Sequence, residues 1–359
     1  MKVILRQASL ESLGDWAAPP SKPVRGRIRS RTARPADRSA GDCIPGVRMR
    51  SDCSPMPDSS SSSFVPFDRA LHRRRLDRAA PKFATASFLK TRAAQDTVDR
   101  LELILRRFPV AVDLGARRGA FAQALSLSDA AKKIDVLIET DLSPAMLAGR
   151  AGLRAAVDEE ALPFADASLD LVVSTLALHW SNDVVGALVQ IRRALRPDGL
   201  FIGAMLGGAT LTELRQVLLE AEAEITGGVV PRVSPFADAS DAAGLLQRAG
   251  FALPVADVDR VQVRYPHLFA VLADLRAMGE GHSALEKTGR RLTRAVLARA
   301  AQLYAERFSG PDGKIAVTFE ILTMTGWAPH ESQQKPLKRG SGKTNLGDAL
   351  EAIRRDRKD

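Results

Sequence analysis

The chain has 359 residues, 45% of them hydrophobic, which is enough for one large domain or two small ones. Its net charge is +10, and the first 56 residues hold +6 of it, with eleven Lys or Arg against five Asp or Glu. Since only +4 remains for the rest, and no nucleic-acid-binding motif occurs, the charge does not indicate binding to DNA or RNA.

The N-terminal segment differs from the rest of the chain. It contains both cysteines, Cys43 and Cys53, so a disulfide, a cysteine-ligated zinc site and a cysteine nucleophile are excluded from the body. Residues 1–63 are rich in Pro, Ser and Arg and lack periodicity, which predicts disorder. The segment is either a dispensable tail, with Met49 or Met56 as the true start, or an organelle-targeting peptide, against which its five acidic residues argue.

Ordered structure is expected from about Phe64. The segment Phe67–Ala80 has a helical pattern, and a second helix is predicted over Thr91–Arg107. The first helix has a basic face made of Arg69, Arg73, Arg74 and Arg78. This face is either solvated or part of a helix that covers or docks beside a pocket.

Strands and helices then alternate. The expected strands are Pro109–Leu114, Ile134–Thr140, Leu153–Val157, Leu169–Thr175 and Leu200–Met205. The expected helices between them are Gly119–Leu125, Pro144–Ala151 and Val184–Leu195, with a turn at Arg196–Gly199. This order predicts a parallel sheet with helices on both faces.

The second half is mostly helical, with predicted helices at Leu211–Ile225, Ala239–Gly250, Leu268–Met278 and Ser283–Phe308. Two segments, Val258–Tyr265 and Lys314–Trp327, alternate with a period of two, which predicts an antiparallel pair at the edge of the sheet. No apolar run is long enough for a transmembrane helix. The sequence thus predicts one domain over 64–332, with a cofactor-binding core at about 108–206, between tails at 1–63 and 333–359.

Polar residues follow the carboxyl ends of the predicted strands, where ligands of such sheets bind. A glycine loop with Asp113 follows the first strand, and Asp141 follows the second. The Asp141 carboxylate can accept hydrogen bonds from both hydroxyls of a ribose. Asp158 and its neighbours follow the third strand and can bind the edge of an adenine. Each aspartate could instead only cap a helix or turn.

The combination is more informative than its parts. A glycine loop, an acidic strand end about 26 residues later, and the segments DEEALPF, DLVVS…LHW and LRPDGL resemble class I S-adenosylmethionine-dependent methyltransferases. The loop lacks a full G-x-G-x-x-G pattern, which disfavours a nicotinamide dehydrogenase. The resemblance implies a Rossmann-like sandwich, with a mostly parallel seven-stranded sheet, an antiparallel edge pair and helices on both faces.

A narrower resemblance covers about Phe67 to Leu350. The segments Met205–Arg215 and Gly326–Gln333 are its most specific parts, beside LALHWSND and DLRAMGE. They resemble the mitochondrial complex I assembly factor 5 family of arginine hydroxylases and its bacterial relatives. The malonyl-acyl-carrier-protein O-methyltransferases are a more distant relative. This resemblance implies a subunit of NADH:ubiquinone oxidoreductase as a protein substrate.

The resemblance also implies S-adenosylmethionine as the cofactor and assigns roles around it. Asp141 would hold the ribose, Leu142 would pack on the adenine, and Ser174 would line the rim of the fourth strand. The acidic pair Asp158 and Glu159 would flank the adenine. The loop residues near the methionine part would be Asp113, Gly115, Ala116, Arg117 and Gly119.

Arg117 departs from the family pattern, which usually has glycine there. A long side chain where φ is positive is strained. We expect Arg117 to turn outward or to pair with the carboxylate of the cofactor, as a planar guanidinium can. The alternative is that this chain has lost cofactor binding.

The sequence does not decide whether the chain transfers a methyl group, hydroxylates its substrate or has no catalytic activity. Methyl transfer requires alignment and exclusion of water, and a base only for an amine or hydroxyl acceptor. His179, four residues before Asp183, is the candidate for that base, and the alternative is a buried histidine of the core. Hydroxylation usually requires iron held by two histidines and a carboxylate, and we recognise no such set. A non-catalytic docking factor is the third alternative. The composition fits a bacterial cytoplasmic chain, with the mitochondrial matrix as the eukaryotic alternative.

Overall fold

The computed structural model describes residues 66–282 and 292–334, together with positions 345, 347, 351 and 355. The predicted tail at 1–63 lies outside these residues, as does the first part, 283–291, of the helix expected at Ser283–Phe308. Within the described ranges, no helix is both long enough and apolar enough to cross a membrane.

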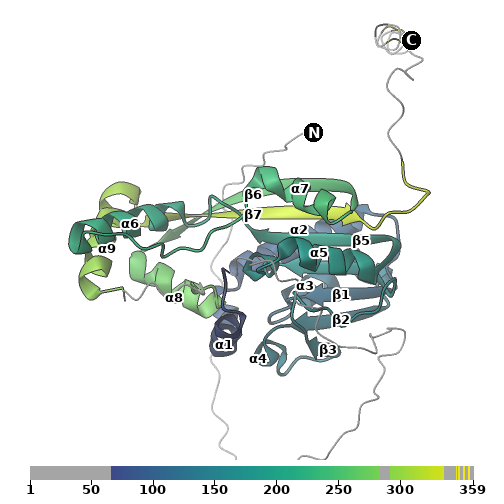
Figure 1. Ribbon diagram of the computed structural model, residues 1–359, viewed down its shortest axis with the longest axis horizontal. Coiled ribbons are helices and arrows are strands. Elements are labelled where there is room, and N and C mark those ends of the chain that lie inside the picture. The colour runs from purple at the N-terminus through teal and green to yellow at the C-terminus, as the bar shows by residue number, and fades with distance from the viewer. Residues whose placement is uncertain are drawn as a thin grey trace, which may run out of the picture.

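One seven-stranded sheet forms the centre of the molecule, in the order β3-β2-β1-β4-β5-β7-β6 (Figure 1). Strands β1 to β5 pair in parallel, and β7 is antiparallel to both β5 and β6. The mostly parallel sheet with an antiparallel edge is therefore confirmed. The strands are β1 (Val110–Leu114), β2 (Val136–Asp141), β3 (Leu153–Ala156), β4 (Leu169–Thr175), β5 (Leu195–Leu206), β6 (Ala252–Tyr265) and β7 (Ile315–Trp327).

Helices cover both faces of the sheet, because side chains of the central strands alternate between two apolar layers. Ala111 of β1 packs with α2 (Phe88–Leu103) and α3 (Ala120–Ser126) on one face. Val112 packs on the other face with α5 (Val184–Ala194) and α7 (Ala239–Arg248). Strands β1 and β4 are buried along their whole length, as expected for parallel strands covered on both sides.

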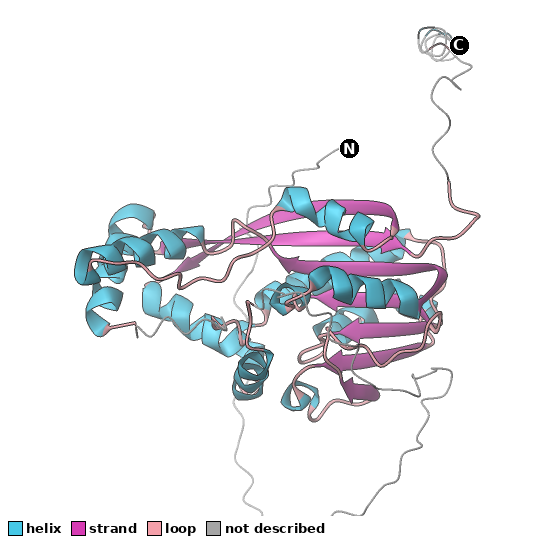
Figure 2. Ribbon diagram, viewed as in Figure 1, coloured by secondary structure: helices cyan, strands magenta, loops and turns pink. Residues whose placement is uncertain are grey.

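A second packing unit extends from the sheet beyond β5. There α6 (Thr212–Thr226), α8 (Leu268–Met278) and α9 (Arg294–Phe308) pack with the long strands β6 and β7 (Figure 2). Helix α1 (Arg69–Ala79) lies close to α8 and to the short helix α4 (Pro144–Leu147). This arrangement brings the first and the late helices of the chain to the same end of the sheet.

Among the predicted strands, the starts of β5 and β6 differ most from the structure. The turn expected at Arg196–Gly199 belongs to β5, because Asp198 N donates to Ala328 O and Ala328 N donates to Gly199 O. These bonds keep the segment in the sheet despite a φ of 63° at Asp198. Strand β6 begins at Ala252 rather than Val258, since β7 is long enough to pair with the whole segment.

Candidate functional site

The loop after β1 folds back onto the end of β2. Gly115 and Gly119 have φ values of 76° and 75°, in the left-handed region. The amides of Gly115 and Ala116 both donate to the carbonyl oxygen of Thr140, at 2.9 and 2.8 Å. A methyl group added at Gly115 would overlap that of Ala177, so a glycine is required there.

Arg117 turns inward, and our expectation that it turns outward is wrong. Its side chain is buried, although its φ is 55°. Its backbone amide and its Nη1 both donate to Asp141 Oδ2, at 2.8 and 3.0 Å. Burial alone would lower the pKa of Arg117, but the carboxylates of Asp141, Glu159 and Glu280 outweigh burial and raise it. The attraction of these carboxylates is the physical reason for the inward orientation.

Asp141 ends β2 and is fully buried. Its Oδ2 accepts both bonds from Arg117, and its Oδ1 accepts from the amide of Ser143 at 2.8 Å. Both oxygens therefore bind the chain itself. Asp141 lies at the strand end, as expected, and its contact with a ribose stays a prediction. In this conformation the guanidinium of Arg117 occupies part of the hydrogen-bonding capacity of Asp141.

Helix α1 holds the acidic loop that follows β3. Arg69 Nη2 donates to Asp158 Oδ1 at 2.7 Å and to Glu159, and Arg69 Nη1 donates to the carbonyl oxygen of Trp180 at 3.1 Å. The acidic pair thus binds α1 rather than standing free beside a base. Of the predicted basic face, Arg69 contacts the site, while Arg73, Arg74 and Arg78 are exposed.

The buried face of α1 makes three further contacts at this edge. His72 stacks on Trp180, with ring centroids 4.6 Å apart. Asp77 accepts a hydrogen bond of 2.6 Å from the hydroxyl of Ser143. Leu142, which we expected to pack on adenine, packs in an apolar cluster with Leu76 and Phe83. The hypothesis of a helix that covers the site is therefore supported by these contacts.

Lys90 of α2 is a buried cation that the sequence did not reveal. Its Nζ donates to Gly115 O at 2.5 Å and to Thr175 O, at the carboxyl ends of β1 and β4. Burial lowers the pKa of Lys90 to about 8. Neighbouring Asp113 is fully buried, and neither of its carboxylate oxygens has a hydrogen-bond partner among the described residues. Burial raises the pKa of Asp113 to about 7. Ser174, by contrast, is satisfied, because its hydroxyl donates to Leu114 O at 3.0 Å.

His179 pairs with Glu280 and not with Asp183. His179 lies in a short helix (Leu178–Trp180), and its Nε2 is 3.0 Å from Glu280 Oε2. Trp180 Nε1 donates to the same oxygen at 2.6 Å. Asp183 is exposed and caps α5, where its Oδ1 accepts from the amide of Gly186 at 2.7 Å. Burial raises the pKa of Glu280, but His179, Arg117 and Trp180 outweigh burial and lower it.

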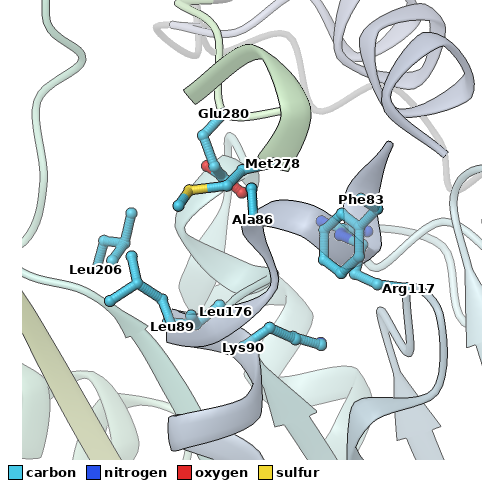
Figure 3. Close-up of a pocket in the computed structure, with 9 residues that line it drawn as sticks. All are labelled: Phe83, Ala86, Leu89, Lys90, Arg117, Leu176, Leu206, Met278 and Glu280. Atoms are coloured by element: carbon cyan, nitrogen blue, oxygen red, sulfur yellow. The ribbon is translucent and has the colours of Figure 1, made fainter. Parts of the chain in front are cut away.

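A small cavity, with a volume of about 20 Å³ and partly open to solvent, lies between these elements (Figure 3). Three charged side chains line it, from three different parts of the fold: Lys90, Arg117 and Glu280. Of the predicted cofactor residues, only Arg117 reaches this wall. The other walls are apolar and consist of Phe83, Ala86, Leu89, Leu176, Leu206 and Met278.

The charges at this edge nearly balance. The cations are Arg69, Lys90 and Arg117, and the carboxylates are Asp113, Asp141, Asp158, Glu159 and Glu280. The side chain of Asp158 is 35% exposed and the pKa of Asp113 rises to about 7, so neither adds a full buried negative charge at neutral pH. The described part of the chain contains no group of three or more His, Cys, Asp or Glu side chains arranged to hold a metal ion.

Several buried polar atoms of this edge have no hydrogen-bond partner in the part of the chain that the structure describes. They are both oxygens of Asp113, Nη2 of Arg117, Oγ1 of Thr175 and Nδ1 of His179. Such atoms are rare in native proteins and commonly mark a site for water or ligand. Donors and acceptors occur together here, which fits a zwitterionic ligand. The methionine end of S-adenosylmethionine has this chemistry, whereas its ribose would need Arg117 to release Asp141.

Comparison with known proteins agrees with this arrangement. A family model described as a methyltransferase domain matches residues 112–203, which span β1 to β5. The mitochondrial arginine-hydroxylase NDUFAF5 of Danio rerio is 40% identical over 297 residues, covering 81% of this chain and 91% of that protein. The Homo sapiens protein of that name is 40% identical over 303 residues, covering 84% and 88%.

A bacterial methyltransferase is a further relative. The malonyl-[acyl-carrier protein] O-methyltransferase of Methylovorus sp. (strain MP688) is 33% identical over 276 residues, covering 73% of this chain and 90% of that protein. The higher identity to the first group agrees with the segments Met205–Arg215 and Gly326–Gln333, on which the resemblance rested. This chain has a methyltransferase domain and belongs to the family of the mitochondrial arginine-hydroxylase NDUFAF5.

Proposed function

We propose that this chain is an S-adenosylmethionine-dependent methyltransferase that acts on a protein substrate in the assembly of respiratory complex I. The observation that carries the proposal is the group of buried atoms of Asp113, Arg117 and Thr175, near the carboxyl ends of β1 and β4, that have no hydrogen-bond partner within the described residues. S-adenosylmethionine is cationic overall and has an amino-acid end and a ribose, which this edge can bind. The complex I link follows from the family resemblance.

The chain's own residues would divide the work of binding. Asp113 offers two free acceptors to the ammonium group of the cofactor, and Arg117 Nη2 offers a free donor to its carboxylate. Asp141 holds the ribose once the guanidinium of Arg117 leaves its Oδ2. When bound, S-adenosylmethionine supplies a methyl group that is already activated for transfer. Burial under α1 and Phe83 excludes water from this edge.

His179 is the residue that we propose to accept a proton from an amine or hydroxyl acceptor. In the neutral ring, a hydrogen on Nε2 suits the contact with Glu280 and leaves a lone pair on Nδ1. Nδ1 has no partner within the described residues. Asp183 is not needed for this role, because its carboxylate caps α5.

Arginine hydroxylation is the second candidate, and the names of the relatives at 40% identity favour it. The two chemistries are distinguished by the product. Methyl transfer adds one methylene to the mass of the substrate protein, whereas hydroxylation adds one oxygen atom. The same relatives are mitochondrial proteins, so the proposal places a eukaryotic chain of this kind in the mitochondrial matrix and a bacterial one in the cytoplasm.

Calorimetric titration of S-adenosylmethionine into the full chain tests the proposal. We expect the wild type to bind at micromolar concentration and Asp141→Ala to abolish binding. Arg118→Gly is the matched control for Arg117→Gly, since Arg118 lies in the same loop but is exposed. If Arg117→Gly binds S-adenosylmethionine and the wild type and Arg118→Gly do not, Arg117 closes the site. Methyl transfer by this chain is then excluded, and a non-catalytic docking factor becomes the favoured alternative. If neither binds, the proposal fails.

A further inference from the structure

The outer side of α1 carries a row of positively charged side chains, which we call the basic stripe. It consists of Arg73, Arg74 and Arg78 of the helix and of Lys82, which follows the helix. All four residues are exposed. Among the residues that the structure describes, none of the four side chains forms an ion pair or a hydrogen bond. The basic stripe therefore presents its charges to the solvent.

Exposed arginines elsewhere on the described surface are commonly bonded to a carboxylate. Arg106, Arg193, Arg264 and Arg307, for example, each pair with an aspartate or a glutamate. The basic stripe instead places four unpaired cations on successive turns at one end of the molecule. This concentration is not the usual state of an exposed arginine in this chain.

The cations of α1 repel one another. Arg74 and Arg78 are four residues apart on the helix, a spacing at which like charges destabilise it. Burial, and after it the charge of Arg78, lowers the pKa of Arg75. The first turn of α1 contains no acidic residue that would offset the positive charge. A negatively charged partner bound to the stripe would relieve this repulsion.

The opposite side of α1 fixes the stripe beside the candidate site. Arg69 donates to Asp158, and Asp77 accepts a hydrogen bond from Ser143, so the helix is bonded to the loops that follow β3 and β2. Helix α1 lies at the end of the sheet that carries the site (Figure 1). Because the helix is already held in place, a partner that binds the stripe does not have to order it, which favours binding.

The surroundings of the stripe favour a protein over a membrane or a nucleic acid. A helix that binds a membrane surface combines basic with exposed apolar side chains, and none of the exposed large hydrophobic side chains of the described residues lies on α1. Nucleic-acid binding requires a wide basic surface, whereas the chain after residue 56 has a net charge of only +4. The 11-residue helix is about 16 Å long, which matches about five residues of an extended segment.

We propose that the basic stripe of α1 is a docking surface for an acidic segment of a protein partner, whose Asp or Glu carboxylates pair with Arg73, Arg74, Arg78 and Lys82. The inference goes beyond the proposed function and does not depend on the reaction, because an enzyme and a non-catalytic docking factor both need such a contact. The pairs would be exposed, so the binding should weaken strongly with salt.

Fluorescence anisotropy with the full chain tests the inference. The probe is a labelled peptide of alternating glutamate and alanine, and the reference probe has glutamine in place of glutamate. The test variant is Arg73→Gln/Arg74→Gln/Arg78→Gln. The matched control is Arg248→Gln/Arg294→Gln/Lys314→Gln, which removes the same charge at three exposed positions on other elements, also without an ion pair among the described residues.

We expect the test variant to bind the glutamate peptide at least about tenfold more weakly than the wild type, as loss of three exposed ion pairs implies, and the control to stay within about twofold. Binding should disappear at about 1 M salt. The first 56 residues are also basic, so a glutamate peptide with a photoreactive group locates the contact in the wild type. Its crosslinks, mapped by mass spectrometry, should fall on residues 69–82.

Four results would overturn the inference. They are equal binding of both peptides by the wild type, equal losses in the test variant and its control, crosslinks confined to the first 56 residues, and tighter binding of phosphatidylglycerol vesicles or of a single-stranded oligonucleotide that the test variant abolishes. The crosslinks decide the matter even if the test variant fails to fold. If S-adenosylmethionine does not bind but the stripe captures the peptide, the proposed function fails and the docking surface stands. The reverse pattern refutes only the docking surface.

Discussion

Arg117 and Asp141 contact each other twice, through the backbone amide and through Nη1 of Arg117, and both bonds end on Asp141 Oδ2. The two side chains are 2% and 0% exposed. The negative charge of buried Asp141 is thereby neutralised by Arg117. Asp141 is also the residue to which the family resemblance assigns a contact with the ribose. The oxygen atom that stabilises this pair is therefore one that the predicted ribose contact would also need.

Removal of the Arg117 side chain should destabilise the protein strongly. Arg117→Ala leaves Asp141 buried without its cation, which we expect to lower the free energy of unfolding by about 3–5 kcal/mol. Arg117→Gly should lose about 1 kcal/mol less, because glycine adopts the positive φ without strain. Urea unfolding measures both. The double variant Arg117→Ala/Asp141→Ala should be more stable than Arg117→Ala, and equal losses would refute a coupled pair.

The glycine loop gives a test of steric fit. Gly115→Ala introduces both a strained φ and an overlap with Ala177, so we expect a loss of about 3 kcal/mol or more. Gly149 has nearly the same φ, 75°, and nothing within 4 Å of an added methyl group. Gly149→Ala should therefore lose only about 1 kcal/mol, the part due to backbone strain. Thermal unfolding of both variants separates the two effects, and similar losses would count against the overlap.

Asp113 should make the protein less stable as the pH rises. Its pKa increases from an ordinary 3.8 to about 7 on folding, so between these values the folded state binds a proton that the unfolded state has released. The stabilising contribution is complete below about pH 3.8 and is lost as the pH rises through 7.

Asp113→Asn removes this titration. We expect the difference in unfolding free energy between the variant and the wild type to shift in favour of the variant from pH 4 to pH 7.5. Denaturant titration at a series of pH values measures it. This range lies below the pKa of about 8 of Lys90, so the neighbouring amine contributes little to the difference. A difference that is constant with pH would show that Asp113 is already ionised at low pH.

Asp183 should behave as a helix cap. Asp183→Ala removes the bond to the amide of Gly186 and should lower stability by about 1 kcal/mol, whereas Asp183→Ser keeps a capping oxygen and should lose little. Neither change should alter binding of S-adenosylmethionine. If Asp183 were catalytic, Asp183→Ser would restore stability but not turnover. Measurement of stability and turnover for both variants therefore decides between the two roles.

Much of the fold could be predicted from local patterns. The fully buried strands β1 and β4 are mostly apolar, and β6 and β7 alternate with a period of two, so their type was evident. Chain order cannot show that β7 inserts between β5 and β6, since the pairing depends on which edge of the sheet is open when the late strands form. The register of β5 through Asp198 likewise depends on bonds to Ala328.

The candidate site was only partly predictable for a similar reason. Strand ends are visible in sequence, so Asp113, Asp141 and the acidic pair after β3 could be named. Lys90 could not, because it looks like an ordinary residue of an amphipathic helix. Glu280 ends the segment DLRAMGE, on which the resemblance partly rested, but nothing in the sequence placed it beside the strand ends. Glu280 is 101 residues from His179, which it contacts. Arg117 points inward because it is attracted to the carboxylates of Asp141, Glu159 and Glu280. These residues are far from Arg117 in the sequence, so no local pattern indicates the orientation.

The placement of Glu280 after α8 also has a consequence for the order in which the site forms during synthesis. The ribosome releases α1, the glycine loop and β1 to β5 well before α8, so a growing chain can build the central strands while one wall of the cavity is still being translated. At that stage Trp180 and His179 lack their shared acceptor. The wall that contains Glu280 is therefore completed after the walls that α2, β4 and β5 provide.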